Sequence, residues 1–167
     1  MKRIIKLFII FCVLIILDIA SKAYVYQNVS KMSWLYPFYP YGGIGIFKDF
    51  LGISFSINYV DNTGAAWGLL AKYPHFLFSI RIFIVIGLLI YLAKFNFDKA
   101  KDLPLLLIIT GAIGNILDFI FYRKVIDMFH FNFWGYSYPI FNLADAMITV
   151  GIVWLFITFF KKKIKNA

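Results

Sequence analysis

Four apolar segments dominate this sequence, and each is long enough to cross the hydrocarbon core of a lipid bilayer. They cover residues 4–24, 76–92, 103–122 and 140–160. A helix of about 17–25 predominantly apolar residues spans such a core. Hydrophobic residues make up 62% of the chain and charged residues only 15%, whereas soluble domains are roughly 25% charged. The sequence therefore predicts a mainly α-helical, polytopic membrane protein, with residues 1–167 forming a single integral membrane domain.

The basic residues indicate the side of the membrane on which each segment lies. Ten of the 17 Lys and Arg residues lie near span ends on the side of both termini. These are Lys2, Arg3, Lys6, Lys94, Lys99, Lys101, Lys161, Lys162, Lys163 and Lys165. Short cytoplasmic segments carry an excess of Lys and Arg, so both termini are expected in the cytoplasm and residues 25–75 and 123–139 outside. This clustering also argues against a nucleic-acid partner, despite the net charge of +9.

The outer segment between the first two spans has the pattern of a β-strand. Residues 52–60, GISFSINYV, alternate apolar and polar side chains, which is typical of a strand with one apolar face. The turn-forming residues Asp61, Asn62 and Gly64 follow. Upstream, YPFYPYGGIGIF is rich in aromatic side chains, which favour the headgroup level of a bilayer. We therefore expect a strand preceded by a segment that rests on the membrane surface.

Four aspartates lie within or next to the predicted spans, where a carboxylate is costly. An ionisable residue at the centre of a span costs about 2.5–3.5 kcal/mol on insertion scales, so each is a candidate functional residue. With the sidedness above, all four fall towards the outer ends of their spans: Asp18, Asp118, Asp127 and Asp145. Carboxylates from several elements at one depth predict a functional site near the outer interface.

Helical spacing groups these aspartates with other small or polar residues. One face of the third span collects residues three and four apart, namely Gly111, Gly114, Asn115 and Asp118. The fourth span has a second such face, formed by Asn142, Asp145 and Thr149. Glycines on a helix face allow another helix to approach closely, and asparagine can hydrogen-bond a neighbouring carboxylate. We expect these two faces to look at each other rather than at lipid.

Two aspartates brought together have an evident chemistry. Because like charges a few ångströms apart cannot both ionise cheaply, such a pair shares a proton. The ionised member activates a water while the protonated member polarises a carbonyl group. Composition and spacing leave proton conduction through the same carboxylates open as an alternative. No metal or cofactor is expected, because His75 and His130 do not form a zinc motif and no glycine-rich phosphate loop is present.

Five short motifs follow one another along the chain: DIASK at 18–22, NTGAAWG at 62–68, GAIGNILD at 111–118, VIDMF at 125–129 and FNLADAMI at 141–148. Together they resemble the motifs of the lipoprotein signal peptidases (signal peptidase II), a family of bacterial intramembrane aspartic peptidases. Each motif alone is a weak or moderate signal. Five in the family's order, across all four spans, are a strong one.

The resemblance implies that Asp127 and Asp145 form the catalytic pair. Supporting or substrate-binding roles then fall to Asp18, Lys22, Asn62, Gly64, Asn115, Asp118, Arg123 and Asn142. The implied reaction is the removal of the signal peptide from diacylglyceryl-modified prolipoproteins, by cleavage before the lipidated cysteine. The resemblance also implies a monomer in the bacterial inner membrane, in contact with lipids and without a cofactor. Its active site would lie near the outer leaflet, and the outer segment 25–75 would form a small periplasmic, β-containing cradle or lid.

Two positions depart from the family pattern. The family usually has arginine directly after the aspartate of the third-span motif, where this chain has Phe119. It usually has glycine four residues before the catalytic aspartate, where this chain has Arg123. The basic residue that neutralises Asp118 is therefore expected to be Arg123, Lys124 or Lys22.

Two other functions are compatible with buried carboxylates in a small membrane protein. A transporter or proton-coupled channel would use them as a relay, and a non-enzymatic membrane subunit would use them structurally. A transporter predicts polar residues through the whole membrane depth and often repeated halves. Here the ionisable residues gather at one side and no repeat is visible, which favours the peptidase.

Overall fold

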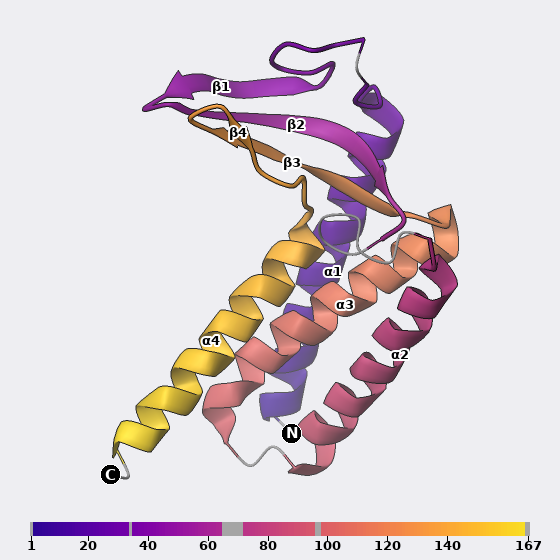
Figure 1. The fold of residues 1–167 in the computed structure, drawn as a ribbon. Coiled ribbons are helices and arrows are strands. Elements are labelled where there is room, and N and C mark those ends of the chain that lie inside the picture. The colour runs from indigo at the N-terminus through magenta and orange to yellow at the C-terminus, as the bar shows by residue number, and fades with distance from the viewer. Residues whose placement is uncertain (1, 34, 65–71, 96–97, 166–167) are drawn as a thin grey trace. The chain divides into compact units, whose positions relative to one another are not determined.

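The computed structural model describes residues 2–33, 35–64, 72–95 and 98–165. It contains four long helices and one small antiparallel sheet (Figure 1). The chain divides into two compact units, and each is described by itself. The helical unit comprises Met1–Asp18, Phe78–Leu117 and Leu143–Ala167. The sheet unit comprises Ile19–Leu77 and Asp118–Asn142.

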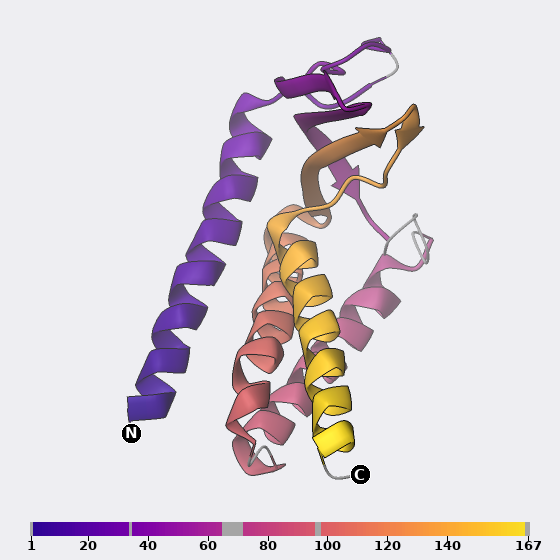
Figure 2. The ribbon, with the colours of Figure 1, turned by 90° about the vertical axis from the view of Figure 1, so that its left-hand side faces the viewer.

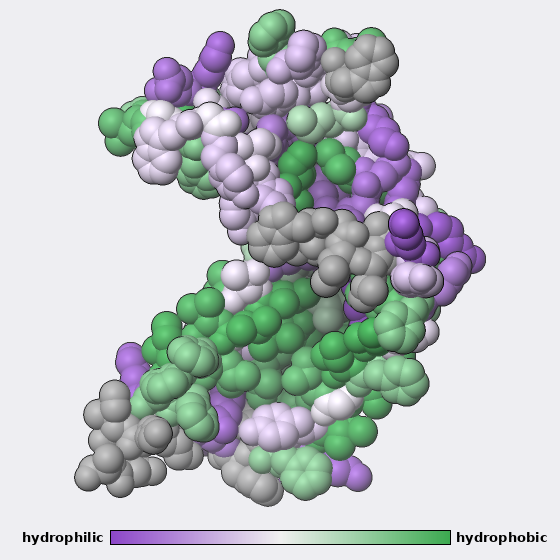
Figure 3. Space-filling view, viewed as in Figure 1, coloured by the Kyte–Doolittle hydropathy of each residue, from purple (hydrophilic) through white to green (hydrophobic). Residues whose placement is uncertain are grey.

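All four predicted spans form helices that are long and apolar enough to cross a membrane. The helices are α1 (Lys2–Asn28), α2 (Pro74–Ile90), α3 (Asp102–Tyr122) and α4 (Leu143–Lys165). A π-helical turn, Tyr91–Phe95, extends α2, and a 3-10 turn, Lys99–Lys101, leads into α3. Hydrophobic residues cover much of the surface over these helices in Figure 3. This agrees with the prediction of a chain whose solvent is a bilayer.

The predicted helix boundaries at 24, 140 and 160 are wrong, the last because α4 ends at Lys165. The first helix continues to Asn28 instead of ending at 24, so the start of the predicted outer segment is helical. The last helix begins at Leu143 instead of 140. The reason is that Phe141 pairs with Phe129 of the sheet as an isolated β-bridge, which keeps the chain before Leu143 extended. Asn142 therefore precedes α4 and does not share a helical face with Asp145.

Close packing of α3 against α4 holds the helical unit together, and glycines allow it. A Cβ atom on Gly111 would overlap the carbonyl oxygen of Ala144 in α4. A Cβ atom on Gly151 would lie 2.7 Å from both the Pro104 carbonyl oxygen and the Ile108 side chain in α3. The two helices accordingly run side by side in Figures 1 and 2. The prediction that the glycine face of the third span receives another helix is confirmed.

We expect Gly111→Ala to destabilise the protein by about 1–3 kcal/mol, because the added methyl group must push the α4 backbone away. The measurement is the free energy of unfolding in detergent. Gly87→Ala in α2 is the matched control, since no atom lies within 4 Å of its Cβ position. That control should stabilise the helix by up to about 1 kcal/mol, because alanine has the higher helix propensity. Equal effects of the two substitutions would contradict the close packing.

The sheet unit is built on four antiparallel strands in the order β1-β2-β3-β4. They are β1 (Ile44–Phe50), β2 (Ile53–Asn62), β3 (Val125–Phe133) and β4 (Tyr136–Ser137). The strand predicted at 52–60 is confirmed as β2, whereas β1, β3 and β4 were not predicted. In β3 the last five residues, FHFNF at 129–133, alternate apolar and polar side chains, a strand signal that the sequence analysis did not use.

The two faces of the sheet differ, and the polar side chains of β2 are the more buried ones. Ser56 and Asn58 are 1% and 0% exposed. Asn58 Nδ2 donates to the carbonyl oxygen of Pro40 at 2.7 Å, so the loop before β1 covers this face. On the other face Phe55 stacks on Phe131, with 4.3 Å between ring centroids, and both rings are only partly buried. Three residues predicted on the apolar face are only partly buried, namely Ile53, Phe55 and Ile57, whereas the protein buries Ser56, Asn58 and also Tyr59, which is 8% exposed.

Candidate active site

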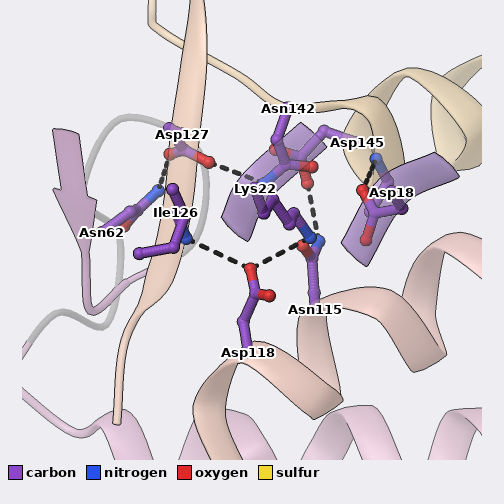
Figure 4. A network of polar contacts seen from close by, with 10 residues as sticks. Asp18, Lys22, Asn62, Asn115, Asp118, Ile126, Asp127, Asn142 and Asp145 are labelled. Carbon is purple, nitrogen blue, oxygen red and sulfur yellow. Dashed lines mark hydrogen bonds and ion pairs between the residues drawn. The ribbon is translucent and has the colours of Figure 1, made fainter. Parts of the chain in front are cut away.

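Asp127 is buried in β3, and both of its carboxylate oxygens accept hydrogen bonds from asparagine side chains (Figure 4). Asn62 Nδ2 donates to Oδ2 at 2.8 Å, and Asn142 Nδ2 donates to Oδ1 at 2.7 Å. The antiparallel pairing of β2 with β3 places Val60 opposite Asp127, two residues from Asn62. Two neutral amide donors thus hold this carboxylate in one orientation.

The asparagine that ends β2 is itself held in place by the chain that follows. Asn62 Oδ1 accepts a hydrogen bond of 2.9 Å from the backbone N–H of Gly64. This contact is an Asx-turn, in which the side chain satisfies a backbone donor two residues ahead. It directs the amide group of Asn62 towards Asp127. The remaining residues of this motif, 65–68, lie outside the described part of the chain.

Asp118, near the end of α3, is 3% exposed and pairs with Lys22 of α1, which is 1% exposed. The Nζ of Lys22 lies 3.0 Å from Oδ2 of Asp118. The same oxygen accepts the backbone N–H of Ile126 at 3.1 Å (Figure 4). Because Ile126 directly precedes Asp127, the ion pair fixes the backbone that carries Asp127. The sequence left open which of three basic residues neutralises Asp118, and the structure shows Lys22 as such a partner.

Asp145 lies in the first turn of α4, within the helical unit. Its Oδ1 accepts a hydrogen bond of 2.8 Å from Asn115 Nδ2 of α3 (Figure 4). Asp145 is half-buried, whereas Asp127 is 2% exposed. A carboxylate in the first turn of a helix also interacts favourably with the unpaired N–H groups there. The predicted contact between the asparagine of the third span and a neighbouring carboxylate is thus present.

Asp18 of α1 provides a cap for the helix that carries Asp145. Its Oδ1 accepts the backbone N–H of Ala144, in the first turn of α4, at 2.9 Å. Gly114 of α3 lies directly against the same carboxylate, since a Cβ atom there would overlap Asp18 Oδ2. Asp18 is fully buried, and its role in the helical unit is to orient the start of α4.

An ion-pair cluster lies beside Asn62, and it includes Lys124, which the sequence analysis considered only as a partner of Asp118. Asp61 contacts Lys31 at 2.6 Å and Lys124 at 2.7 Å, and Lys124 also donates to the Tyr59 hydroxyl at 2.9 Å. Burial alone would raise the pKa of Asp61, but hydrogen bonds from Lys124, Lys31 and Tyr59 outweigh it and lower that pKa to about 2. The stabilising contribution of Asp61 is therefore complete above its ordinary pKa of about 3.9 and is lost as the pH falls towards 2.

Arg123 occupies a backbone conformation that suits glycine. Its φ is 59°, in the left-handed region, and its side chain is exposed. The family pattern has glycine at this position for a clear physical reason, since a side chain in this region costs roughly 1–2 kcal/mol. Arg123 therefore lies in a strained turn between α3 and β3. The Arg123 side chain takes no part in the contacts of Asp118 with Lys22 and Ile126.

Replacing Arg123 by glycine is expected to stabilise the protein by about 0.5–1 kcal/mol. The gain comes from relieving the left-handed strain, less the greater freedom of glycine in the unfolded chain. Thermal unfolding in detergent measures it. Arg123→Ala removes the same charge but keeps a Cβ atom, so it should give no such gain. A stabilisation by alanine as large as that by glycine would assign the effect to charge instead of backbone strain.

One ionisable residue inside a span was not among the predicted site residues. Arg81 lies in α2 and is half-buried, and the other polar side chains of that helix are His75 and Ser79. The signal that selected the aspartates, a charge inside a span, also applies to it.

Within the sheet unit the structure brings Asp127 together with two asparagines, and Asp118 with Lys22. Within the helical unit it joins Asp145 to Asn115, and Asp18 to the start of α4.

Comparison with known proteins decides the family. The sequence model described as "Signal peptidase (SPase) II" matches residues 10–161. The chain belongs to the signal peptidase II family. Among curated lipoprotein signal peptidases, that of Clostridium acetobutylicum is 30% identical over 141 residues, covering 83% of each chain.

Other signal peptidase II relatives match over a shorter length. The lipoprotein signal peptidase of Chlamydia pneumoniae is 43% identical over 109 residues, 64% of this chain and 65% of the relative. That of Bacillus pumilus is 43% identical over 97 residues, 58% of this chain and 63% of the relative. The chain thus spans a little under two thirds of the length of these relatives.

A solved structure shares the fold of this signal peptidase II family member. It is described as a bacterial membrane enzyme determined by the in meso method, and it matches with a TM-score of 0.82 at 26% identity. The match covers 97% of this chain and 92% of the other. Family membership and four apolar helices together make the chain a multi-pass membrane protein.

Proposed function

We propose that this chain is an aspartic endopeptidase that removes the signal peptide from diacylglyceryl-modified prolipoproteins, cutting before the lipidated cysteine. The observation that carries the proposal is that hydrogen bonds orient the carboxylates of two aspartates in the family's motifs. Asparagine side chains hold both oxygens of Asp127 and one oxygen of Asp145. Such positioning of carboxylates is what acid–base catalysis on a peptide bond requires.

In the proposed mechanism Asp127 and Asp145 share one proton at the start of the reaction. The ionised carboxylate accepts a proton from a water molecule, and the resulting hydroxide attacks the scissile carbonyl carbon. The protonated carboxyl group donates its proton to the carbonyl oxygen. As the tetrahedral gem-diol collapses, the C–N bond breaks and the carboxyl group that took the water proton donates it to the departing amine. One hydroxyl proton of the diol passes to the other carboxylate, which restores the shared proton. No metal takes part in these steps.

The proposed site lies near the outer leaflet of the bacterial inner membrane, with both termini in the cytoplasm. The support is the excess of Lys and Arg on the short segments beside the termini. The acyl chains of the substrate would anchor its cysteine at the interface, and the sheet unit would form the periplasmic cradle. We further propose that the enzyme acts as a monomer.

The direct test incubates the purified, detergent-solubilised protein with a diacylglyceryl prolipoprotein. We expect release of a signal peptide whose last residue is the one before the lipidated cysteine, identified by mass spectrometry. The same precursor without the diacylglyceryl group is the control, and it should be cleaved far more slowly. Intact lipidated precursor at the end of the assay, with folded protein present, would reject the peptidase in favour of a relay or a structural role for the aspartates.

A further inference from the structure

The helical unit also contains an apolar cavity, and none of the candidate-site residues belongs to its lining. Its volume is about 780 Å³, within the range of about 300–1,000 Å³ of small-molecule pockets. Apolar side chains from three helical segments line it, including Leu7, Phe11, Leu89, Leu92, Ile109 and Ile113. The cavity opens to the outside of the unit, because two of its lining residues are exposed: Phe8 at 63% and Leu89 at 45%.

One end of this cavity is basic. Arg3 and Lys94 belong to its lining, whereas the aspartates of the candidate site do not. Arg3 directs Nε and Nη2 to Asp102, which leaves its Nη1 for another acceptor. Among the residues that the structure describes, Lys94 forms no ion pair. The end of the cavity therefore offers N–H donors and positive charge to an anion.

The surrounding segments add to this charge. Residues 2–6 and 91–102 carry six basic side chains against two acidic ones, Asp98 and Asp102. Along α1 the lining residues Arg3, Leu7 and Phe11 follow at intervals of four, on one helix face. The distance from Arg3 to Phe11 along the helix axis is about 12 Å. The cavity is thus charged at one end and apolar for about 12 Å beyond it.

A phospholipid has the matching arrangement, with a charged headgroup at one end and apolar acyl chains beyond it. In a membrane, an open cavity with apolar walls has lipid acyl chains as its neighbours, and leaving it empty would forfeit the dispersion contacts of its lining. Basic pockets between membrane-spanning helices on the cytoplasmic side bind anionic headgroups. We infer that this cavity binds one anionic phospholipid, with an acyl chain along Leu7 and Phe11 and the phosphate at Arg3 and Lys94.

The test is native mass spectrometry of the whole, delipidated protein in detergent, titrated with phosphatidylglycerol or with phosphatidylcholine. We expect one phosphatidylglycerol to bind at least about fivefold more tightly than phosphatidylcholine. Lys94→Gln should remove most of that preference. Leu7→Trp, which fills the cavity, should weaken the binding of both lipids by about tenfold, while prolipoprotein cleavage continues in both variants.

The matched control is Ile9→Trp, on a different face of the same helix, away from the cavity lining. It should leave phosphatidylglycerol binding unchanged. Equal affinity of the unmodified protein for the two lipids, or equal losses in Leu7→Trp and Ile9→Trp, would overturn the inference. Displacement of the lipid by a signal-peptide segment would also overturn it, by assigning the cavity to the substrate. If Leu7→Trp does not fold, the lipid preference of Lys94→Gln alone decides.

Discussion

Replacing Asp127 or Asp145 by asparagine is expected to reduce prolipoprotein cleavage by about 10²–10⁴-fold or more. Asparagine preserves the size of the side chain but cannot accept a proton from water or donate one from a carboxyl group. At position 127 the change also sets a third amide against Asn62 and Asn142. The measurement is kcat/KM on a diacylglyceryl prolipoprotein, with thermal unfolding as the check that each variant is folded.

Asp49→Asn is the matched control, because Asp49 is exposed in β1 and the chemical change is the same. It should cleave like the unmodified protein. The Asp127→Asn/Asp145→Asn double variant should lose little more than either single variant, since residues that act as a unit are not additive. Substantial cleavage by either folded single variant would exclude the dyad. Loss caused equally by Asp118→Asn would extend direct catalysis to Asp118, to which we assign a supporting role.

The second large effect is expected at the ion pair between Lys22 and Asp118. Replacing Lys22 by methionine should destabilise the protein by about 3–5 kcal/mol, because it removes one partner of a buried ion pair. Both side chains are almost fully buried, at 1% and 4% exposure. The free energy of unfolding in detergent measures the loss. Activity should also fall, since Asp118 holds the backbone of Ile126 next to Asp127.

A double-mutant cycle separates the ion pair from simple loss of packing. Asp118→Asn retains an oxygen that can accept the Ile126 N–H but removes the charge, so the Lys22→Met/Asp118→Asn variant should recover much of the stability. Lys48→Met, at an exposed position in β1, is the control for loss of a lysine and should change stability by less than about 0.5 kcal/mol. Additive effects of the two core substitutions would mean that the pair is not coupled.

The position that departs most clearly from the family pattern is explained by packing within the sheet unit. Phe119, where the family usually has arginine, is 4% exposed and contacts His75 edge to face, with 5.6 Å between ring centroids. Lys22 supplies the positive charge beside Asp118. The sequence suggested Arg123 as the partner of Asp118, with Lys124 or Lys22 as alternatives. The choice depends on the three-dimensional course of α1 and α3, which spacing along the chain does not contain.

The four spans and the unusual polar residues in them were determined by the sequence alone. Hydrophobic length and the cost of a buried charge are local properties, so they can be read along one segment. Even the close approach at Gly111 followed from spacing on one helix. Motifs in a fixed order were enough to indicate the family, which the comparisons confirmed.

Only the tertiary structure decided which groups serve which carboxylate. Asn62 and Asp127 are 65 residues apart in sequence, and the pairing of β2 with β3 brings them together. A separate bridge between Phe129 and Phe141 keeps the chain extended before Leu143, where α4 begins. The loop before β1 covers the buried Asn58 of β2. These features depend on the free energy of contacts between distant segments, which cannot be predicted from any one segment alone.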